Sequence, residues 1–204
     1  MEAAVNFSKI KNEYSYSDYK KLVIAQAENR HTSGIEQLPE RIEATKINAQ
    51  RMKRIDKHVE LFNELKGVLK NIKKNWTWFV LVESWCGDGA QNLPVIAKIA
   101  ESSLNIELKI LLRDENPEIM DGYLTNGSRS IPKLICIDSD TQEEIGTWGS
   151  RPVKIQQMVK EFKAQFADTP HDEFVKNLHL WYAKDKGESL QRDFEKLLTE
   201  WVIG

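Results

Sequence analysis

The segment VLVESWCGDGAQNLPVIAKIAE, residues 80–101, contains the side chains best suited to chemistry in this 204-residue chain. Cys86 follows a buried-type apolar run and stands where a helical pattern begins. The first turn of a helix offers unpaired N–H groups and the positive end of the helix dipole, and both favour a thiolate over a thiol. Asp88 opposes them, because it adds a like charge to the same turn. We expect the helix terminus to outweigh Asp88 modestly, giving an accessible Cys86 thiol with a lowered pKa.

The second cysteine, Cys136, is expected to be an inert core residue, since it lies between Ile135 and Ile137 in a short apolar run. Cys86 fits that role poorly, because the glycines and the acid that follow it are poor core material. Two cysteines cannot form a disulfide framework, and this favours a reducing cytoplasm as the compartment.

The composition and the absence of certain motifs disfavour several functional classes. A net charge of −2 disfavours a basic nucleic-acid binder. No apolar run approaches the ~20 residues that cross a bilayer, and the N-terminal residues do not resemble a signal peptide. The four histidines have no metal-ligand spacing, and no phosphate-binding or dinucleotide-binding glycine pattern is present. We therefore expect no metal, no resident cofactor, no nucleic acid and no membrane as partners, and the oligomeric state stays open.

The periodicity of apolar residues predicts the elements that must position Cys86. Residues 76–82 form a nearly unbroken apolar run, typical of a strand buried on both faces. Further strands are predicted at 105–112, 133–138 and 143–148, the last two as a hairpin. Helices are predicted across 15–75 with a break near Ile55–His58, and at 94–101, 117–124, 153–167, from 170 to Gly187, and from there to the C-terminus. The strand–helix order indicates an α/β layered fold.

Four short motifs follow one another along the chain: the turn Trp85-Cys86-Gly87-Asp88-Gly89 with Pro94 beyond it, the loop Asp114, Asn116 and Pro117, the loop Arg129-Ser130-Ile131-Pro132, and Gly149. In this order they resemble the thioredoxin-like superfamily, in which the loop that matches Ile131-Pro132 carries a cis-proline. The resemblance implies a four-stranded mixed sheet with flanking helices, plus extra N- and C-terminal helices. We divide the chain into an N-terminal helical extension (1–57), a thioredoxin-like domain (58–167) and a C-terminal helical extension (168–204) packed on the core.

The resemblance also implies roles for individual residues. Cys86 would be the nucleophile, with Asp88 or Glu83 tuning its protonation. The substrate would be positioned by Trp85, Gly87, Ile131, Pro132 and Gly149. An alternative of equal weight is that Pro132 only sets the entry of a strand. The chain departs from the family where Gly89 replaces the second cysteine of the dithiol motif, and where Val80 replaces the buried acid.

Two functions fit this pattern. The first is a monothiol thiol–disulfide oxidoreductase, in which Cys86 forms a mixed disulfide or a sulfenic acid and glutathione or another thiol restores it. Its partners would be protein or peptide thiols and disulfides. The second is a thioredoxin-fold module that binds a protein or peptide without turnover. A third, less favoured class is a cluster-binding dimer that uses Cys86 and glutathione as ligands.

Three further expectations concern the surroundings of the turn. Arg51 or Arg54 would reach the site and bind an anion or pair with Asp88, although a solvated helix face is the commoner role. His179 and its neighbours would either line a groove or dock an amphipathic helix. Position 89 should face the Cys86 sulfur, so Gly89→Cys should form a disulfide with Cys86 without harming the fold.

Overall fold

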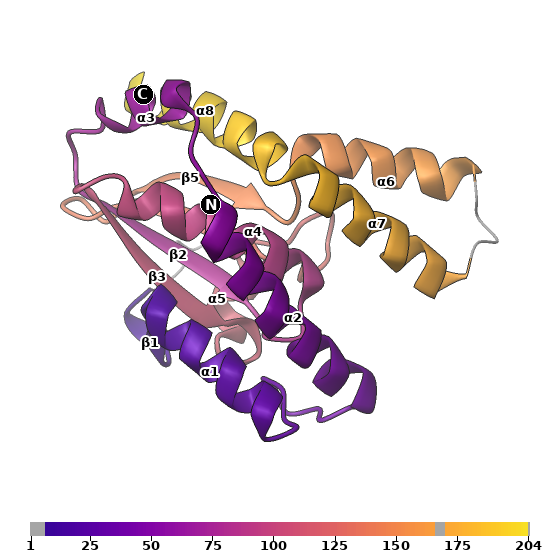
Figure 1. Ribbon diagram of the computed structural model, residues 1–204. Coiled ribbons are helices and arrows are strands. Elements are labelled where there is room, and N and C mark those ends of the chain that lie inside the picture. Colours follow the sequence, from indigo (N-terminus) through magenta and orange to yellow (C-terminus); the bar gives the residue numbers. More distant parts are fainter. Residues whose placement is uncertain (1–6, 166–169, 204) are drawn as a thin grey trace.

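The computed structural model describes residues 7–165 and 170–203 (Figure 1). The strands are β1 (Glu13–Tyr14), β2 (Trp76–Val82), β3 (Ile106–Leu112), β4 (Lys133–Asp138) and β5 (Glu144–Gly149). The helices are α1 (Tyr16–Glu28), α2 (Pro39–His58), α3 (Asn63–Leu69), α4 (Gly87–Glu101), α5 (Pro117–Asp121), α6 (Val153–Gln165), α7 (His171–Asp185) and α8 (Glu188–Ile203), with 3-10 turns η1 (Phe7–Lys9) and η2 (Arg113–Glu115). This is the expected mixed α/β fold with additional helices.

The sheet is centred on β2, in the order β1-β3-β2-β4-β5. Strand β2 runs parallel to β3 and antiparallel to β4, and β5 is antiparallel to β4. All seven residues of β2 are buried, which explains why its sequence is an unbroken apolar run rather than an alternating one. Because β2 ends at Val82, the carboxyl end of the central strand delivers the chain directly to Cys86.

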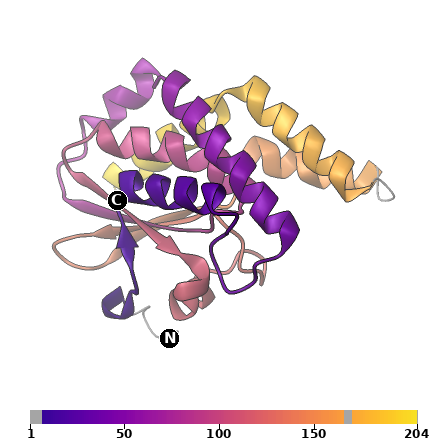
Figure 2. The ribbon, with the colours of Figure 1, turned by 60° about the horizontal axis from the view of Figure 1, so that its bottom comes forward.

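The two faces of the sheet are covered unequally (Figure 2). On one face Trp78 of β2 packs against Phe194 of α8, with ring centroids 5.5 Å apart. Helix α4 lies on this same face, since Gly89 in its first turn contacts Val82. On the opposite face the ring of Phe7 in η1 stacks on Phe79, 5.0 Å between centroids. The apolar stripes of α8 and α4 are therefore buried against the sheet, as amphipathic helices require.

The N-terminal elements differ from the prediction in one respect. Strand β1 adds a fifth strand, pairing Glu13 with Leu111 of β3. Two residues are too few to give a periodic signal, so the sequence alone predicted four strands. Helix α1 is capped by Ser15, whose side chain accepts from the N–H of Asp18 at 3.1 Å. The break expected near Ile55–His58 is confirmed, since α2 ends at His58.

Helices α6 and α7 form an arm that extends from the body (Figure 1). Their buried apolar residues form a small cluster of their own, separate from the main core: Ile155, Val159, Leu178 and Tyr182. We expected the added helices to pack on the central domain. Helix α8 does so through Phe194, whereas α7 joins α4 through hydrogen bonds of Tyr182 and His179. Residues 166 and 167 of the predicted helix, and the domain limit at 167/168, lie outside the described residues. The proposed domain limits remain a prediction.

Across residues 7–165 and 170–203, no helix combines the length and the apolar character needed to cross a membrane.

Candidate functional site

Cys86 is the N-cap residue of α4. Its backbone is extended (φ −74°, ψ 111°), and its sulfur accepts a hydrogen bond from the N–H of Gly89 at 3.3 Å. The thiol donates to the carbonyl oxygen of Ile131 at 3.4 Å. The turn is closed by the N–H of Cys86, which donates to the carbonyl of Glu83 at 3.0 Å. The sulfur is thus held between a helix N-terminus and the loop before β4.

The thiol is nevertheless buried and protonated at neutral pH, which corrects our expectation of an accessible thiol with a lowered pKa. Cys86 is only 7% exposed. Burial, followed by the charge of Asp88, raises the pKa of Cys86 to about 12, while the N–H of Gly89 and the guanidinium of Arg151 act in the opposite direction. Here the free-energy cost of removing water from the thiolate is larger than the stabilisation that the N-terminus of α4 provides. Cys136 is fully buried, as expected of a core residue.

The carboxylate of Asp88 is held by two partners outside its own helix. Arg151 donates from Nε and Nη2 to Oδ2 at 2.8 and 2.7 Å. Tyr182 of α7 donates its hydroxyl to Oδ1 at 2.7 Å and accepts from the amide of Asn92 at 3.0 Å. Asp88 therefore pairs with Arg151, and the expectation that Arg51 or Arg54 pairs with it is wrong. Its hydrogen bonds fasten the arm to the first turns of α4.

Glu83 is completely buried and serves to tie loops together. Its carboxylate accepts from the hydroxyl of Ser33 and from the N–H of Asp114, the latter at 2.8 Å. Burial raises the pKa of Glu83, and these two hydrogen bonds partly offset the increase. The phenol of Tyr19 lies near Cys86 and Glu83. Burial raises the pKa of Tyr19, and the charges of these two groups raise it further. A tuning role for Glu83 at Cys86 remains a prediction.

A buried polar network fastens the N-terminal helices to the turn. The hydroxyl of Ser84 lies 3.2 Å from that of Thr32 and 3.3 Å from that of Thr45, and it accepts from the N–H of Ser33 at 2.9 Å. The amide of Asn48 donates to the carbonyl of Ser84 at 2.8 Å. Since every group in this network has a partner, α2 is fixed in position beside Cys86.

The residues expected to position a substrate do gather around Cys86. The Ile131–Pro132 peptide bond is cis, as the resemblance implied. Gly149 pairs with Lys133 across β4 and β5. Its φ of 142° lies in the region that favours glycine, and a Cβ there would collide with the carbonyl oxygen of Pro132. Gly149 is therefore required for the two loops to meet beside the thiol.

The remaining two positions are covered by cationic and aromatic side chains. The indole of Trp85 lies between the guanidinium groups of Arg41 and Arg113, 4.5 and 5.0 Å from the ring centroid. A Cβ at Gly87 would lie 2.8 Å from Cε1 of His179 and 3.6 Å from Nη1 of Arg51. The face of Gly87 is thus closed by one side chain from α7 and one from α2.

Position 89 faces the Cys86 sulfur, as expected. A Cβ built there would lie 3.4 Å from Cβ and 3.5 Å from Sγ of Cys86. It would also lie 2.5 Å from Cγ2 of Val82, so the expectation that a substitution leaves the fold unharmed is wrong. Because χ1 of a β-branched valine is restricted, Val82 or the new side chain has to shift to relieve this contact.

Sequence reasoning missed two contributors to the site. Arg151 follows Gly149 by two residues and enters the site because β5 returns beside the Ile131 loop. Asn48 is a polar residue on the buried stripe of α2 with Met52, and a polar group in such a stripe is a signal for a specific partner. His179 and its neighbour Tyr182, for which a groove-lining or docking role was expected, share the face of α7 that meets α4.

Comparison with known proteins gives the family. A family model described as thioredoxin matches residues 35–163, more than half of the chain. A crystal structure of a protein of unknown function from Pseudomonas aeruginosa aligns with a TM-score of 0.58 at 17% identity, covering 91% of this chain and 98% of that one. An HIV epitope scaffold aligns with a TM-score of 0.52 at 18% identity, covering 92% and 97%. No curated protein matches. With Cys86 at the end of the central strand and a cis-proline loop beside it, the chain belongs to the thioredoxin family.

Proposed function

We propose that the protein carries out thiol–disulfide exchange through Cys86 alone. The observation that carries the proposal is the position of its sulfur, at the N-cap of α4 and 3.4 Å from the carbonyl of Ile131 in the cis-proline loop. A disulfide approaching along that loop would meet the sulfur directly. Gly149 leaves the loop unobstructed, and Trp85 closes the turn on the side of Arg41 and Arg113.

The proposed reaction uses two exchange steps. Cys86 loses its proton to solvent, and the thiolate attacks one sulfur of a disulfide RSSR. A Cys86–SR bond forms, the S–S bond breaks and RS⁻ leaves. A second thiol then attacks the mixed disulfide, restores Cys86 and departs as a new disulfide. One half of the substrate is released as the thiol RSH and the other half leaves in the new disulfide RSSR′, so complete reduction of RSSR needs a further thiol to exchange with RSSR′. A reducing compartment such as the cytoplasm would supply that thiol, as glutathione or another small thiol.

The pKa of Cys86 limits the rate of the proposed exchange. With a pKa near 12 for Cys86, few molecules carry a thiolate at neutral pH. Exchange should therefore be slow there and should accelerate as the pH rises.

A trapping experiment tests the proposal. Protein carrying Cys136→Ser is incubated with hydroxyethyl disulfide, and intact-protein mass spectrometry follows the adduct. We expect one adduct, absent from a Cys86→Ser variant and removed by added thiol with recovery of Cys86. The proposal fails if the native protein gains no adduct while the same protein in denaturant does.

The burial of Cys86 favours a second candidate, a module that binds a peptide or protein without turnover. The sulfur would then be one packed side chain of the binding surface. On this alternative Cys86→Ser would leave partner binding intact, whereas thiol–disulfide exchange would lose the covalent adduct completely.

A further inference from the structure

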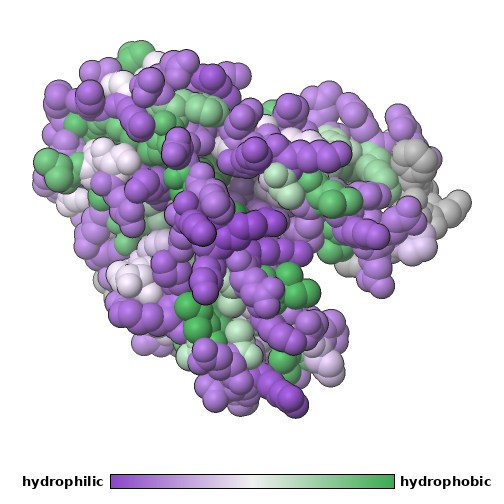
Figure 3. Space-filling view, viewed as in Figure 1, coloured by the Kyte–Doolittle hydropathy of each residue, from purple (hydrophilic) through white to green (hydrophobic). Residues whose placement is uncertain are grey.

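A groove between α2 and α7 leads to the turn that carries Cys86. It has a volume of about 700 Å³ and is lined by residues of α2, by Gln91 of α4, and by residues of α7 that include Lys176 and His179. The face seen in Figure 3 is hollowed between the arm of α6 and α7 and the end of the body that carries α1 and α2. The groove has the dimensions of a small-molecule site.

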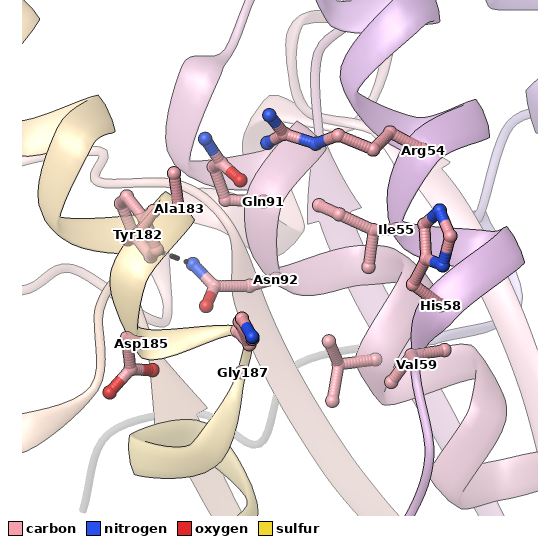
Figure 4. Close-up of a pocket in the computed structure, with 12 residues that line it drawn as sticks. Arg54, Ile55, His58, Val59, Gln91, Asn92, Tyr182, Ala183, Asp185 and Gly187 are labelled. Carbon is pink, nitrogen blue, oxygen red and sulfur yellow. Dashed lines mark hydrogen bonds between the residues drawn. The ribbon is translucent and has the colours of Figure 1, made fainter.

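A second pocket of about 400 Å³ adjoins the groove, since both are lined by Arg54, Gln91 and Ala183. Figure 4 shows Arg54 of α2 extending across this pocket toward Gln91 of α4, with Tyr182 and Asn92 hydrogen-bonded on the far side. The two pockets adjoin along α4 and are together called the cavity.

Cationic side chains predominate in the cavity. Arg51, Arg54, Lys176 and Lys186 line it, against two carboxylates, Asp172 and Asp185. Within the described part of the chain neither Arg51 nor Arg54 forms an ion pair. Arg51 donates only to the side-chain oxygen of Asn48, at 2.8 Å. The two guanidinium groups repel each other. This repulsion adds to the effect of burial, and together they lower the pKa of Arg51. An anion between them would remove that repulsion.

His179 supplies a neutral donor at the inner end of the groove. Burial and the charge of Arg51 lower the pKa of His179 to about 4, so its ring is uncharged at neutral pH. The amide nitrogen of Gln91 lies 3.2 Å from Nδ1, and since an amide nitrogen only donates, Nδ1 accepts and Nε2 carries the proton. That Nε2 lies 2.9 Å from the position of a Cβ at Gly87, the residue after Cys86.

We infer that this groove binds the carboxylates of a small anionic thiol or disulfide, the exchange partner of Cys86. The inference rests on the proposed exchange reaction and names its substrate class. Arg51 and Arg54 would bind the carboxylates and His179 would donate a further hydrogen bond. The sulfur of the ligand would reach Cys86 beside Gly87 once the side chain of His179, which closes that face, turns aside.

The test compares two disulfides that differ in charge. Mixed-disulfide formation on Cys86 is measured with glutathione disulfide, which carries carboxylates, and with uncharged hydroxyethyl disulfide. The Arg51→Gln/Arg54→Gln variant should lose about tenfold in rate with glutathione disulfide and little with hydroxyethyl disulfide, a loss of the size that two partly exposed ion pairs produce. Lys53→Gln/Lys57→Gln is the matched control, with the same charge change on exposed positions of α2. An equal loss in both double variants, or no loss in the arginine variant, overturns the inference.

A binding measurement separates this inference from the reaction on which it rests. The Cys86→Ser protein is titrated with S-methylglutathione, which cannot exchange, and heat is recorded by calorimetry. Binding that disappears in the Arg51→Gln/Arg54→Gln background supports the anion site even if no adduct ever forms on Cys86. An absence of binding to the Cys86→Ser protein contradicts the anion site even if hydroxyethyl disulfide reacts with Cys86.

Discussion

Restoring a second thiol at position 89 probes the geometry of the turn. A Cβ at this position would lie 3.4 Å from Cβ of Cys86, at the lower edge of the roughly 3.5–4.5 Å found in disulfides. It would also lie 2.5 Å from Cγ2 of Val82. Gly89→Cys should therefore be able to form the bond but should strain β2, and Val82→Ala combined with Gly89→Cys should form it without that strain.

The free energies can be estimated from these contacts. Overpacking a core by one side chain costs roughly 1–3 kcal/mol. Removing a glycine from a helix returns roughly 0.5–1 kcal/mol. Reduced Gly89→Cys should thus be less stable than the parent by about 0–2.5 kcal/mol. Val82→Ala alone should lose roughly 1.5 kcal/mol for two methyl groups, and the new thiol should recover part of this by filling the space.

The assay is oxidation followed by thiol counting. Each variant, in a Cys136→Ser background, is treated with diamide, and free thiols are titrated before and after denaturation. We expect the double variant to lose both thiols, and to reduce insulin only partially because Val80 supplies no buried acid. Val82→Ala alone is the control and should keep its single thiol. A folded double variant that retains two free thiols would refute the geometry of the turn described here.

Three shorter predictions follow from the electrostatics. Asp88→Asn should lower the pKa of Cys86 and increase its alkylation by iodoacetamide severalfold at pH 8, because a like charge is removed from the first turn; unchanged alkylation would show that burial alone sets the pKa. Folding favours the neutral ring of His179, because its pKa is lowered from 6.5 to about 4 in the folded protein. The free energy of unfolding should therefore be highest above about pH 6.5 and should fall as the pH drops toward about 4. Urea unfolding should show this loss, and His179→Gln should reduce it. The pKa values of Cys86 and Cys136, each raised from 9.0 to about 12, should decrease stability as the pH rises from about 9 to 12, and Cys136→Ala should flatten that decline.

The central sheet could be predicted because its signals are local. Residues 76–82 are apolar throughout, and a strand buried on both faces by parallel and antiparallel neighbours has such a sequence. The capping serine of α1 and the positions of Cys86, Pro132 and Gly149 were likewise accessible from short motifs. Two residues of β1 carry no such pattern, since their pairing with β3 depends on the tertiary fold.

The protonation state of Cys86 could not be predicted, because its cause is distant in sequence. The helix terminus and Asp88 are visible in residues 86–89, but the burial that dominates the pKa comes from the surrounding packed elements. Asp88 is paired with Arg151, 63 positions away, and with Tyr182, 94 positions away. The basic turn of α2 suggested an anion contact, and only the structure placed Arg51 beside Gly87 rather than on Asp88.

The most direct test of the account is the rate of mixed-disulfide formation on Cys86 in the native protein as a function of pH. Hydroxyethyl disulfide is used with the Cys136→Ser protein, and the global unfolding rate is measured at each pH. We predict an adduct that forms faster than the protein unfolds, at a rate that increases about tenfold per pH unit up to the alkaline range, because Cys86 titrates near pH 12. An adduct that appears only at the rate of global unfolding would contradict exchange at this site.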